Sequence, residues 1–153
     1  MTESPGKESL YVFIRQHQLG VIATASPDGL PEAALLNIAA TPDLELIFET
    51  TDATRKFSNL QRNPRAELVI GWEGDRTLQC RGPVDEPLGR EGERVKAAYL
   101  SSFPQNVSHQ HWPGNRAVCY VEGRAVTWRR RNDPRQVTRR GGAKIAGVSV
   151  PHP

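Results

Sequence analysis

The sequence predicts a mainly β protein of the α+β class, in which an antiparallel sheet curls into a barrel and short helices flank it. Two observations indicate this class. Short apolar runs recur along the chain, separated by turns rich in Pro, Gly and Asp. Among the first five predicted strands only one short helical segment occurs, which is typical of an antiparallel sheet.

The first elements are a helix and a hairpin. Apolar side chains at helical spacing, including Leu10 and Ile14, predict a helix over residues 6–18. Two apolar runs then flank residues 27–29, Pro-Asp-Gly, where Pro restricts φ and Gly29 supplies a positive φ. This pattern predicts a β-hairpin.

The middle of the chain adds three strands and a short helix. A turn at residues 41–43 leads into the strand LELIFET, in which Leu44, Leu46 and Phe48 are expected to alternate with Glu45, Ile47 and Glu49. A short helix, TRKFSNLQRN, follows, with Thr54 or Asp52 as its N-cap. Pro64 ends that helix, and strands are predicted up to Trp72 and over RTLQCRGPV, with a turn at residues 73–75 between them.

The last predicted elements are a helix, a loop and a long strand. The helix is LGREGERVKAAYLSSF, the loop is PQNVSHQHWPGN, and the strand is RAVCYVEGRAVTW with an interruption at Gly123. The prediction therefore comprises six strands and three helices. Residues 1–130 are expected to form a single domain, and residues 131–153 a basic, flexible tail.

Charge is unevenly distributed along the 153 residues. The chain has a net charge of +3, but from Arg129 onward there are seven cations and one anion, Asp133, so this segment carries +6 and the rest −3. The tail could contact nucleic acid or an anionic surface, or it could be a solvated end. Because the acidic body offers no second basic patch, nucleic-acid binding is not the favoured interpretation.

The composition also bears on location and redox state. No apolar run approaches the roughly 18 residues that a bilayer-spanning helix needs. The N-terminus has neither a basic start nor an apolar signal core, so we expect a cytoplasmic protein without a membrane partner. Cys80 and Cys119 lie in apolar stretches that are predicted strands, and we expect two buried thiols without a disulfide.

Several familiar catalytic motifs are absent. The chain contains no GxSxG, P-loop, CxxC or GxGxxG before a helix, which disfavours hydrolase and nucleotide triphosphate chemistry. The carboxylates Asp28, Glu32, Glu45 and Glu49 are not forced into an apolar setting by their sequence neighbours. General acid–base catalysis by these groups is therefore not expected, and no catalytic residue is assigned.

Two histidines raise the question of a metal. His109 and His111 in SHQHW could place two imidazoles on one side of an extended loop. No Cys, Asp or Glu lies near them in the sequence to complete a site. A pair of solvated loop histidines is the favoured interpretation, and no metal is predicted.

Arg55 and Lys56 are the most informative residues. They fall in the first turn of the short helix, where the exposed N–H groups already carry partial positive charge. An anion at the same place would make two cations favourable there, and the preceding residues 49–51 add hydroxyls and backbone donors. A phosphate site is one interpretation, and a solvated basic face is the other.

The order of elements and the block T-x-x-T-R-K-x-x-N-L-x-R-N-P-R-A at residues 51–66 resemble the pyridoxamine 5′-phosphate oxidase-like family of FMN-binding split barrels. The resemblance covers roughly residues 8–130. It implies a six-stranded antiparallel split β-barrel and a homodimer with FMN at the subunit interface. It also implies a flavin-dependent oxidoreductase acting on a small organic molecule, with the flavin carrying the redox chemistry.

The resemblance assigns cofactor-binding roles residue by residue. Arg55 and Lys56 would hold the FMN phosphate. The neighbouring donors would be Thr50, Thr51 and Thr54, the flavin ring would lie against Leu35, Leu36 and Asn37, and Gln79 would be a polar contact from the partner subunit.

Two departures from the family keep alternatives open. The second strand, EAALLNIAA, lacks the basic cofactor-contacting residues of the classical oxidases, and the tail lacks their Arg- and His-containing segment. Oxidation of pyridoxamine phosphate itself is therefore not predicted. The alternatives are a 5-deazaflavin-dependent reductase and a non-catalytic flavin or haem carrier, for which SHQHW offers imidazole ligands.

Overall fold

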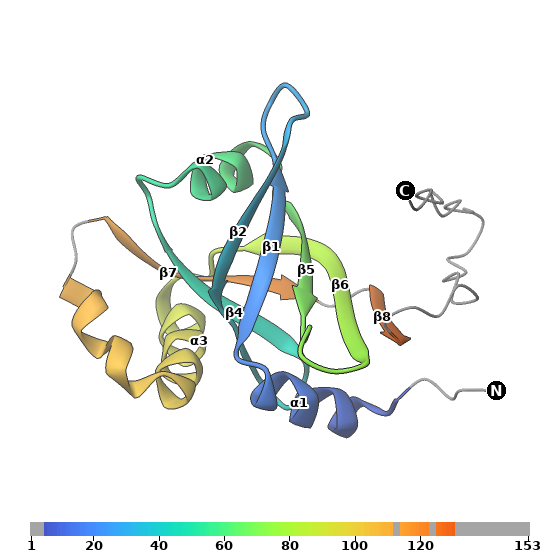
Figure 1. The fold of residues 1–153 in the computed structure, drawn as a ribbon. Helices are drawn as coiled ribbons and strands as arrows, with labels where there is room; N and C mark the ends of the chain where they lie inside the picture. Colours follow the sequence, from blue (N-terminus) through green and yellow to red (C-terminus); the bar gives the residue numbers. More distant parts are fainter. Residues whose placement is uncertain (1–4, 112–113, 123–124, 131–153) are drawn as a thin grey trace.

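The computed structural model describes residues 5–111, 114–122 and 125–130 (Figure 1). The predicted tail, residues 131–153, lies outside the described residues. The helices are α1 (Lys7–Gln16), α2 (Arg55–Arg62), α3 (Gly89–Ser102) and a 3-10 helix (Pro104–His111). The strands are β1 (Leu19–Ala25), β2 (Pro31–Asn37), β3 (Ala39–Ala40), β4 (Glu45–Thr51), β5 (Arg65–Ile70), β6 (Arg76–Asp85), β7 (Asn115–Glu122) and β8 (Ala125–Arg130).

All the strand pairs are antiparallel, in the order β2-β1-β5-β6-β7-β4-β3, with β8 also on β6. The ten-residue strand β6 joins the two halves, because β5 and β8 flank most of it while Val84 near its end pairs with Val121. The predicted α+β class with antiparallel sheets is confirmed. Within the described residues the pairing is an open path that ends at β2 and β3, so a closed barrel is not seen.

The predicted six strands appear as eight in the described residues because two predicted strands each divide. The second predicted strand breaks at Ile38, whose N–H donates to the carbonyl of Gln18 at 2.8 Å. The Ile38 side chain is buried so closely over Gly20 that a Cβ there would lie 2.1 Å from its Cδ1. Consequently β2 pairs with β1, whereas β3 pairs with β4.

The final predicted strand divides into β7 and β8 because its two parts pair with different strands. β7 pairs with β4 and the end of β6, and β8 pairs with the rest of β6. The predicted interruption at Gly123 falls between these strands and lies outside the described residues.

The predicted alternation along LELIFET is wrong in its centre. Leu46, Ile47 and Phe48 are consecutive and all have at most 1% of their surface exposed. Ile47 is buried because α3 covers the second face of β4, where Val95 and Tyr99 form a small core with it. Leu46 and Phe48 face the main core instead.

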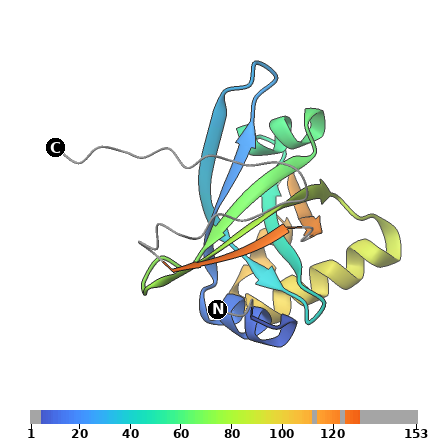
Figure 2. The same ribbon diagram turned by 90° about the vertical axis from the view of Figure 1, so that its right-hand side faces the viewer.

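The main core lies inside the curled sheet, and helices close its two ends. Ile22, Phe48 and Leu68 are fully buried there. Leu10 and Ile14 of α1 cover one end, while Leu60 of α2 packs from the other. Figures 1 and 2 show α1 and α2 at opposite ends of the sheet, with α2 beside the β1–β2 hairpin.

The local predictions for turns and helices are largely confirmed. Gly29 has φ of +80° in the hairpin turn, as its position requires. The predicted loop after α3 is instead a 3-10 helix, Pro104–His111, as far as the described residues extend. Among the described residues, none of the helices has the length and apolar character needed to span a bilayer.

Candidate functional site

The start of α2 is organised by its N-cap. Thr54 has extended backbone angles, and its Oγ1 accepts a hydrogen bond from the Phe57 N–H at 3.3 Å. Thr54, rather than Asp52, is therefore the cap. No acidic residue lies in the first turn of α2, so α2 itself supplies no anion beside Arg55 and Lys56 at its positive end.

Three threonines lock the turn before α2. Thr54 Oγ1 donates to the Thr51 carbonyl at 2.9 Å, and it lies 2.9 Å from Thr50 Oγ1. A hydroxyl has a single proton, so when Thr54 donates to Thr51, Thr50 is the donor in the second contact. Both protons are then used inside the turn. In this arrangement the two hydroxyls order the turn that carries the cation pair.

The turn is also held by Gly114, the residue before β7. The Asp52 N–H donates to the Gly114 carbonyl at 2.9 Å. Gly114 has φ of +72°, and a Cβ there would lie 2.2 Å from Asp52 Oδ1. Only glycine fits this approach without strain, so Gly114 contributes to the geometry that presents Arg55.

Arg55 and Lys56 line a cavity of about 180 Å³ between α2 and the β1–β2 hairpin. The wall consists of residues of the β1–β2 hairpin, the N-cap of α2 and its first two residues, namely Ile22, Thr24, Glu32, Ala33, Ala34, Thr54, Arg55 and Lys56. A cavity with two cations, a helix N-terminus and an apolar floor is suited to an anionic group on an organic ligand.

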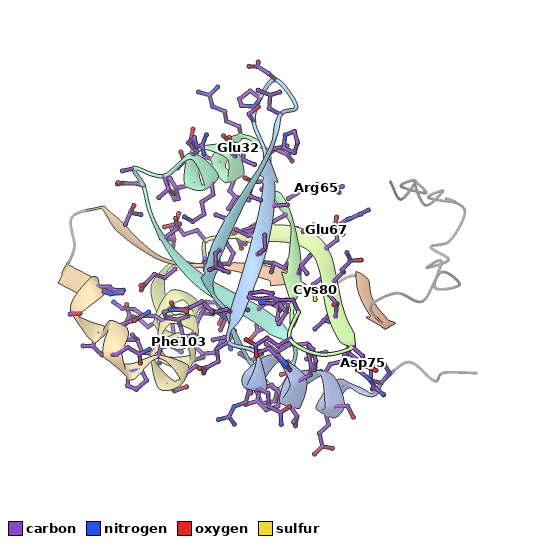
Figure 3. All side chains as sticks on the ribbon, in the orientation of Figure 1. Glu32, Arg65, Glu67, Asp75, Cys80 and Phe103 are labelled. Atoms are coloured by element: carbon purple, nitrogen blue, oxygen red, sulfur yellow. The ribbon has the colours of Figure 1, made fainter. Side chains whose placement is uncertain are left out.

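Glu32 is a member of this site that the sequence reasoning did not predict. Its Oε1 lies 3.1 Å from Arg55 Nη1, and its Oε2 accepts a hydrogen bond from Asn59 Nδ2. The same amide nitrogen donates to Thr24 Oγ1 at 3.1 Å. Figure 3 shows Glu32 beside α2. The predicted hairpin turn could have indicated this residue, because its register pairs Glu32 with Thr24.

Two of the predicted ring-contacting residues lie on opposite faces of β2. Leu36 packs against the main core. Leu35 has 61% of its surface exposed and lies on the outer face of the sheet. The register places Leu35 opposite Val21, Val21 opposite Val69, and Val69 opposite Gln79. Leu35 and Gln79 therefore share one outer row, roughly 14 Å apart at the usual strand spacing.

Asn37 joins a second polar cluster, between β4 and α3. Its side chain hydrogen-bonds to Tyr99, whose hydroxyl also accepts from Asn106 Nδ2 at 3.1 Å. Burial raises the pKa of Tyr99 to about 12, and the negative charge of Glu49 acts in the same direction. His109 Nδ1 contacts Glu49 Oε1, while Glu49 Oε2 is buried without a hydrogen-bond partner among the described residues.

This second cluster corrects one prediction. His109 is half-buried against a carboxylate, so it is not a solvated loop residue. The Glu49 side chain has 13% of its surface exposed and contacts His109 of the 3-10 helix. The side chain of His111 lies outside what the structure describes. Among the described residues, no three His, Cys, Asp or Glu side chains gather in a way that could hold a metal.

The described thiol is structural. Cys80 is buried and free, as predicted. Burial raises its pKa to about 12, with a smaller contribution from the Glu67 charge, so it carries almost no thiolate at neutral pH. The side chain of Cys119 lies outside the described residues.

The structure therefore divides the nine predicted cofactor residues. Thr54, Arg55 and Lys56 line the cavity, and Thr50 and Thr51 lie in the turn that leads to them. The others lie elsewhere in this chain: Leu35 and Gln79 on the outer face, Leu36 in the core and Asn37 beside Tyr99.

Curated proteins resemble this chain in sequence. The curated pyridoxine/pyridoxamine 5′-phosphate oxidase of Azorhizobium caulinodans is 32% identical over 85 residues, which are 55% of this chain and 38% of that protein. The chain therefore spans well under half of this relative's length.

Solved structures share the fold. A haem-binding protein of Mycobacterium smegmatis has a TM-score of 0.72 at 19% identity, covering 84% of this chain and 55% of that one. A conserved hypothetical protein of Mycobacterium tuberculosis has a TM-score of 0.68 at 19% identity, covering 96% and 94%. The sequence model of the family described as pyridoxamine 5′-phosphate oxidase matches residues 7–144, nearly the whole chain. The protein belongs to the pyridoxamine 5′-phosphate oxidase family.

Proposed function

We propose that this chain is an FMN-binding flavoprotein that works as a homodimer and catalyses oxidation or reduction of a small organic molecule. The observation that carries the proposal is the cation pair at the cavity. Arg55 has 85% of its side chain exposed, and Arg55 and Lys56 both line a cavity that a capped helix N-terminus also faces. Family membership favours a flavin as the ligand that carries the anionic group.

The donor set fits a phosphate. An Arg guanidinium has five N–H donors in a fork that matches phosphate oxygens, and Lys adds a point charge. The Arg55 side chain has one ion-pair partner within the described residues, Glu32 through Nη1, so most of its donors remain for a ligand. The cavity of about 180 Å³ is large enough for a phosphate group and part of the ligand chain attached to it. It is smaller than the roughly 300 Å³ at which pockets begin to enclose whole drug-sized ligands.

The ring system of the ligand must therefore lie outside this cavity. The outer face of the sheet has features that suit contact with a second subunit. Leu35, Val21 and Val69 form an apolar row there that ends at the polar Gln79. In the proposed dimer, this face meets the partner, and Gln79 reaches the ring of the partner's cofactor. β2 also lies beside β4, which supports the split barrel of the family as the architecture.

When bound, the flavin would supply the electron and hydride chemistry. The residues of this chain bind and orient it: Arg55 and Lys56 fix the phosphate, and the Thr50–Thr54 turn fixes those cations. No protein acid or base is required by this scheme. Because the chain spans only part of its curated relatives, their substrate is not carried over to it, and the proposed substrate is stated only as a small organic molecule.

The test is to purify the chain, record its visible spectrum and identify the released cofactor by mass. FMN in near one-to-one ratio, with a dimer by light scattering, is the expected result. Oxidation of reduced nicotinamide by the yellow protein would establish turnover. A colourless monomer that does not bind added FMN would overturn the proposal.

A haem carrier is the second candidate, and a specific observation favours it. His109 Nδ1 contacts Glu49, and metal-ligating histidines usually bond a carboxylate through the ring nitrogen that does not hold the metal. A relative in fold is a haem-binding protein. A Soret band in the purified protein, lost in His109→Ala, would select this function. Release of a 5-deazaflavin would select the deazaflavin-dependent reductase instead.

A further inference from the structure

We propose that Glu32 is an internal anion that competes with the cofactor phosphate for Arg55, and that it thereby sets how strongly the pocket binds doubly charged phosphate esters. This inference rests on the proposed FMN function. It assigns to Glu32 a specificity-determining role within the cavity, distinct from the cations that bind the ligand.

The geometry places Glu32 where an anionic ligand would contact Arg55. Its carboxylate lies in the cavity wall, and Oε1 is 3.1 Å from Arg55 Nη1. A phosphate that takes both forks of the Arg55 guanidinium must share it with this oxygen or displace it. Either outcome makes phosphate binding less favourable, because one carboxylate–guanidinium contact is weakened for each phosphate contact formed.

Glu32 does not move away freely when a ligand arrives. Asn59 Nδ2 donates to its Oε2 and also to Thr24 Oγ1, so the amide ties the carboxylate to both α2 and β1. The Glu32 side chain has 22% of its surface exposed, whereas Arg55 has 85%. The mobile partner is therefore Arg55, and the negative charge stays in the wall after Arg55 turns to the ligand.

The charges in the cavity wall make this effect selective. The lining contains two cations, Arg55 and Lys56, and one anion, Glu32. A phosphate monoester carries about −1.5 to −2 near pH 7. Coulomb repulsion from Glu32 scales with ligand charge, so it penalises the monoester dianion most and an uncharged ligand least. Glu32 thus makes the affinity advantage of FMN over riboflavin at this pocket smaller.

The experiment compares FMN and riboflavin binding by flavin fluorescence quenching in wild type and Glu32→Gln. Gln keeps the shape and an acceptor for Asn59 but removes the charge. We expect Glu32→Gln to raise FMN affinity about tenfold and to leave riboflavin affinity within about twofold, from the charge dependence of the repulsion. High salt should shrink the FMN gain.

The matched control is Glu45→Gln. Glu45 is also half-buried, with 20% of its side chain exposed, and also pairs with an arginine, Arg94. It lies at the opposite end of β4 from Thr51, roughly 20 Å away by strand rise. This variant should bind FMN as wild type does. Equal FMN gains in both variants would show a general charge effect and overturn the role of Glu32.

Two further outcomes would also overturn the inference. If Glu32→Gln and Glu32→Ala both bind FMN more weakly than wild type while keeping the wild-type unfolding midpoint, Glu32 is a ligand and not a competitor. If Glu32→Gln raises riboflavin and FMN affinity equally, charge competition is absent. In the Arg55→Ala background, the gain from Glu32→Gln should fall, because competition for that guanidinium is removed.

Failure of this inference is distinguishable from failure of the proposed function. If wild type and every Glu32 variant fail to bind FMN, the cofactor assignment is wrong, and the competition for FMN is wrong with it. If FMN binds wild type and depends on Arg55, but Glu32→Gln leaves its affinity unchanged, the flavin function stands and the role of Glu32 is rejected.

Discussion

The two helices α2 and α3 each bring an arginine to a glutamate on a strand, with very different results. Arg94 of α3 is held on two sides: both terminal nitrogens donate to Glu45, at 2.9 and 2.8 Å, and Nε donates to Glu91. The hydrogen bonds that Arg94 donates to Glu91, followed by those that it donates to Glu45, raise the Arg94 pKa above its usual value. Arg55 of α2 makes one contact, at 3.1 Å, with Glu32.

Exposure sharpens this difference. The Arg94 side chain is 46% exposed, and α3 below it buries Val95 and Tyr99 against Ile47. The Arg55 side chain is 85% exposed at the edge of a cavity. An arginine whose donors are used by its own chain clamps a helix to a strand. An arginine with spare donors at a cavity is available for a ligand.

Removing the cation pair should have the largest effect. Arg55→Ala with Lys56→Ala is expected to weaken FMN binding by about 100-fold or more, because several charge-assisted bonds to the phosphate are lost. The free energy of unfolding should change by less than about 1 kcal/mol, since removing two cations from a helix N-terminus offsets the loss of the solvent-accessible Arg55–Glu32 ion pair. Fluorescence titration and urea unfolding measure the two quantities.

The control removes two cations from α3, as Arg90→Ala with Lys96→Ala. It should bind FMN as wild type does. Unchanged FMN affinity in the α2 variant would return Arg55 and Lys56 to the status of a solvated basic face, and the contrast between the helices would disappear.

The second prediction concerns the clamp on α3. Arg94→Ala should lower the free energy of unfolding by about 1 kcal/mol, a modest amount because the network is partly exposed to solvent. Arg94→Lys should recover part of this loss, since Lys keeps the charge but not the fork. FMN affinity should stay at the wild-type value in both. A variant that lost flavin while keeping its stability would reverse the roles assigned to the two arginines.

The smallest effect at neutral pH is expected from Tyr99, which lies under the α3 clamp. Burial raises its pKa to about 12, so the folded protein keeps a proton that the unfolded chain loses near pH 10. The associated stability is complete below about pH 10 and is lost as the pH rises through 12. Urea unfolding from pH 8 to 11 should therefore show a steeper decline for wild type than for Tyr99→Phe.

Tyr99→Phe also loses the hydrogen bond from Asn106, which should lower stability by a similar amount at every pH below 10. Cys80 titrates over the same alkaline range in both proteins and cancels in the comparison. Parallel curves for the two proteins would mean that Tyr99 is not the group responsible.

Local chemistry is what the sequence by itself determined. A capped start of α2 at Thr54 or Asp52, the end of α2 before Pro64, the hairpin turn at Gly29 and the strand after Pro64 each depend on neighbours within a few positions. The interpretation of Arg55 and Lys56 as a phosphate site also depended on local features, since it came from two cations at the positive end of a helix. These features could be predicted without knowing what lies across the fold.

Only the tertiary structure decided which distant residues meet. Glu32 reaches Arg55 because α2 packs against the β1–β2 hairpin, and Glu49 meets His109 because the 3-10 helix returns to β4. Ile47 is buried because α3 covers a face that periodicity assigned to solvent. Strand pairing and helix packing join positions tens of residues apart, and neither leaves a mark in the spacing of the residues that they join. The division of the predicted cofactor residues between the cavity and the outer face arises in the same way.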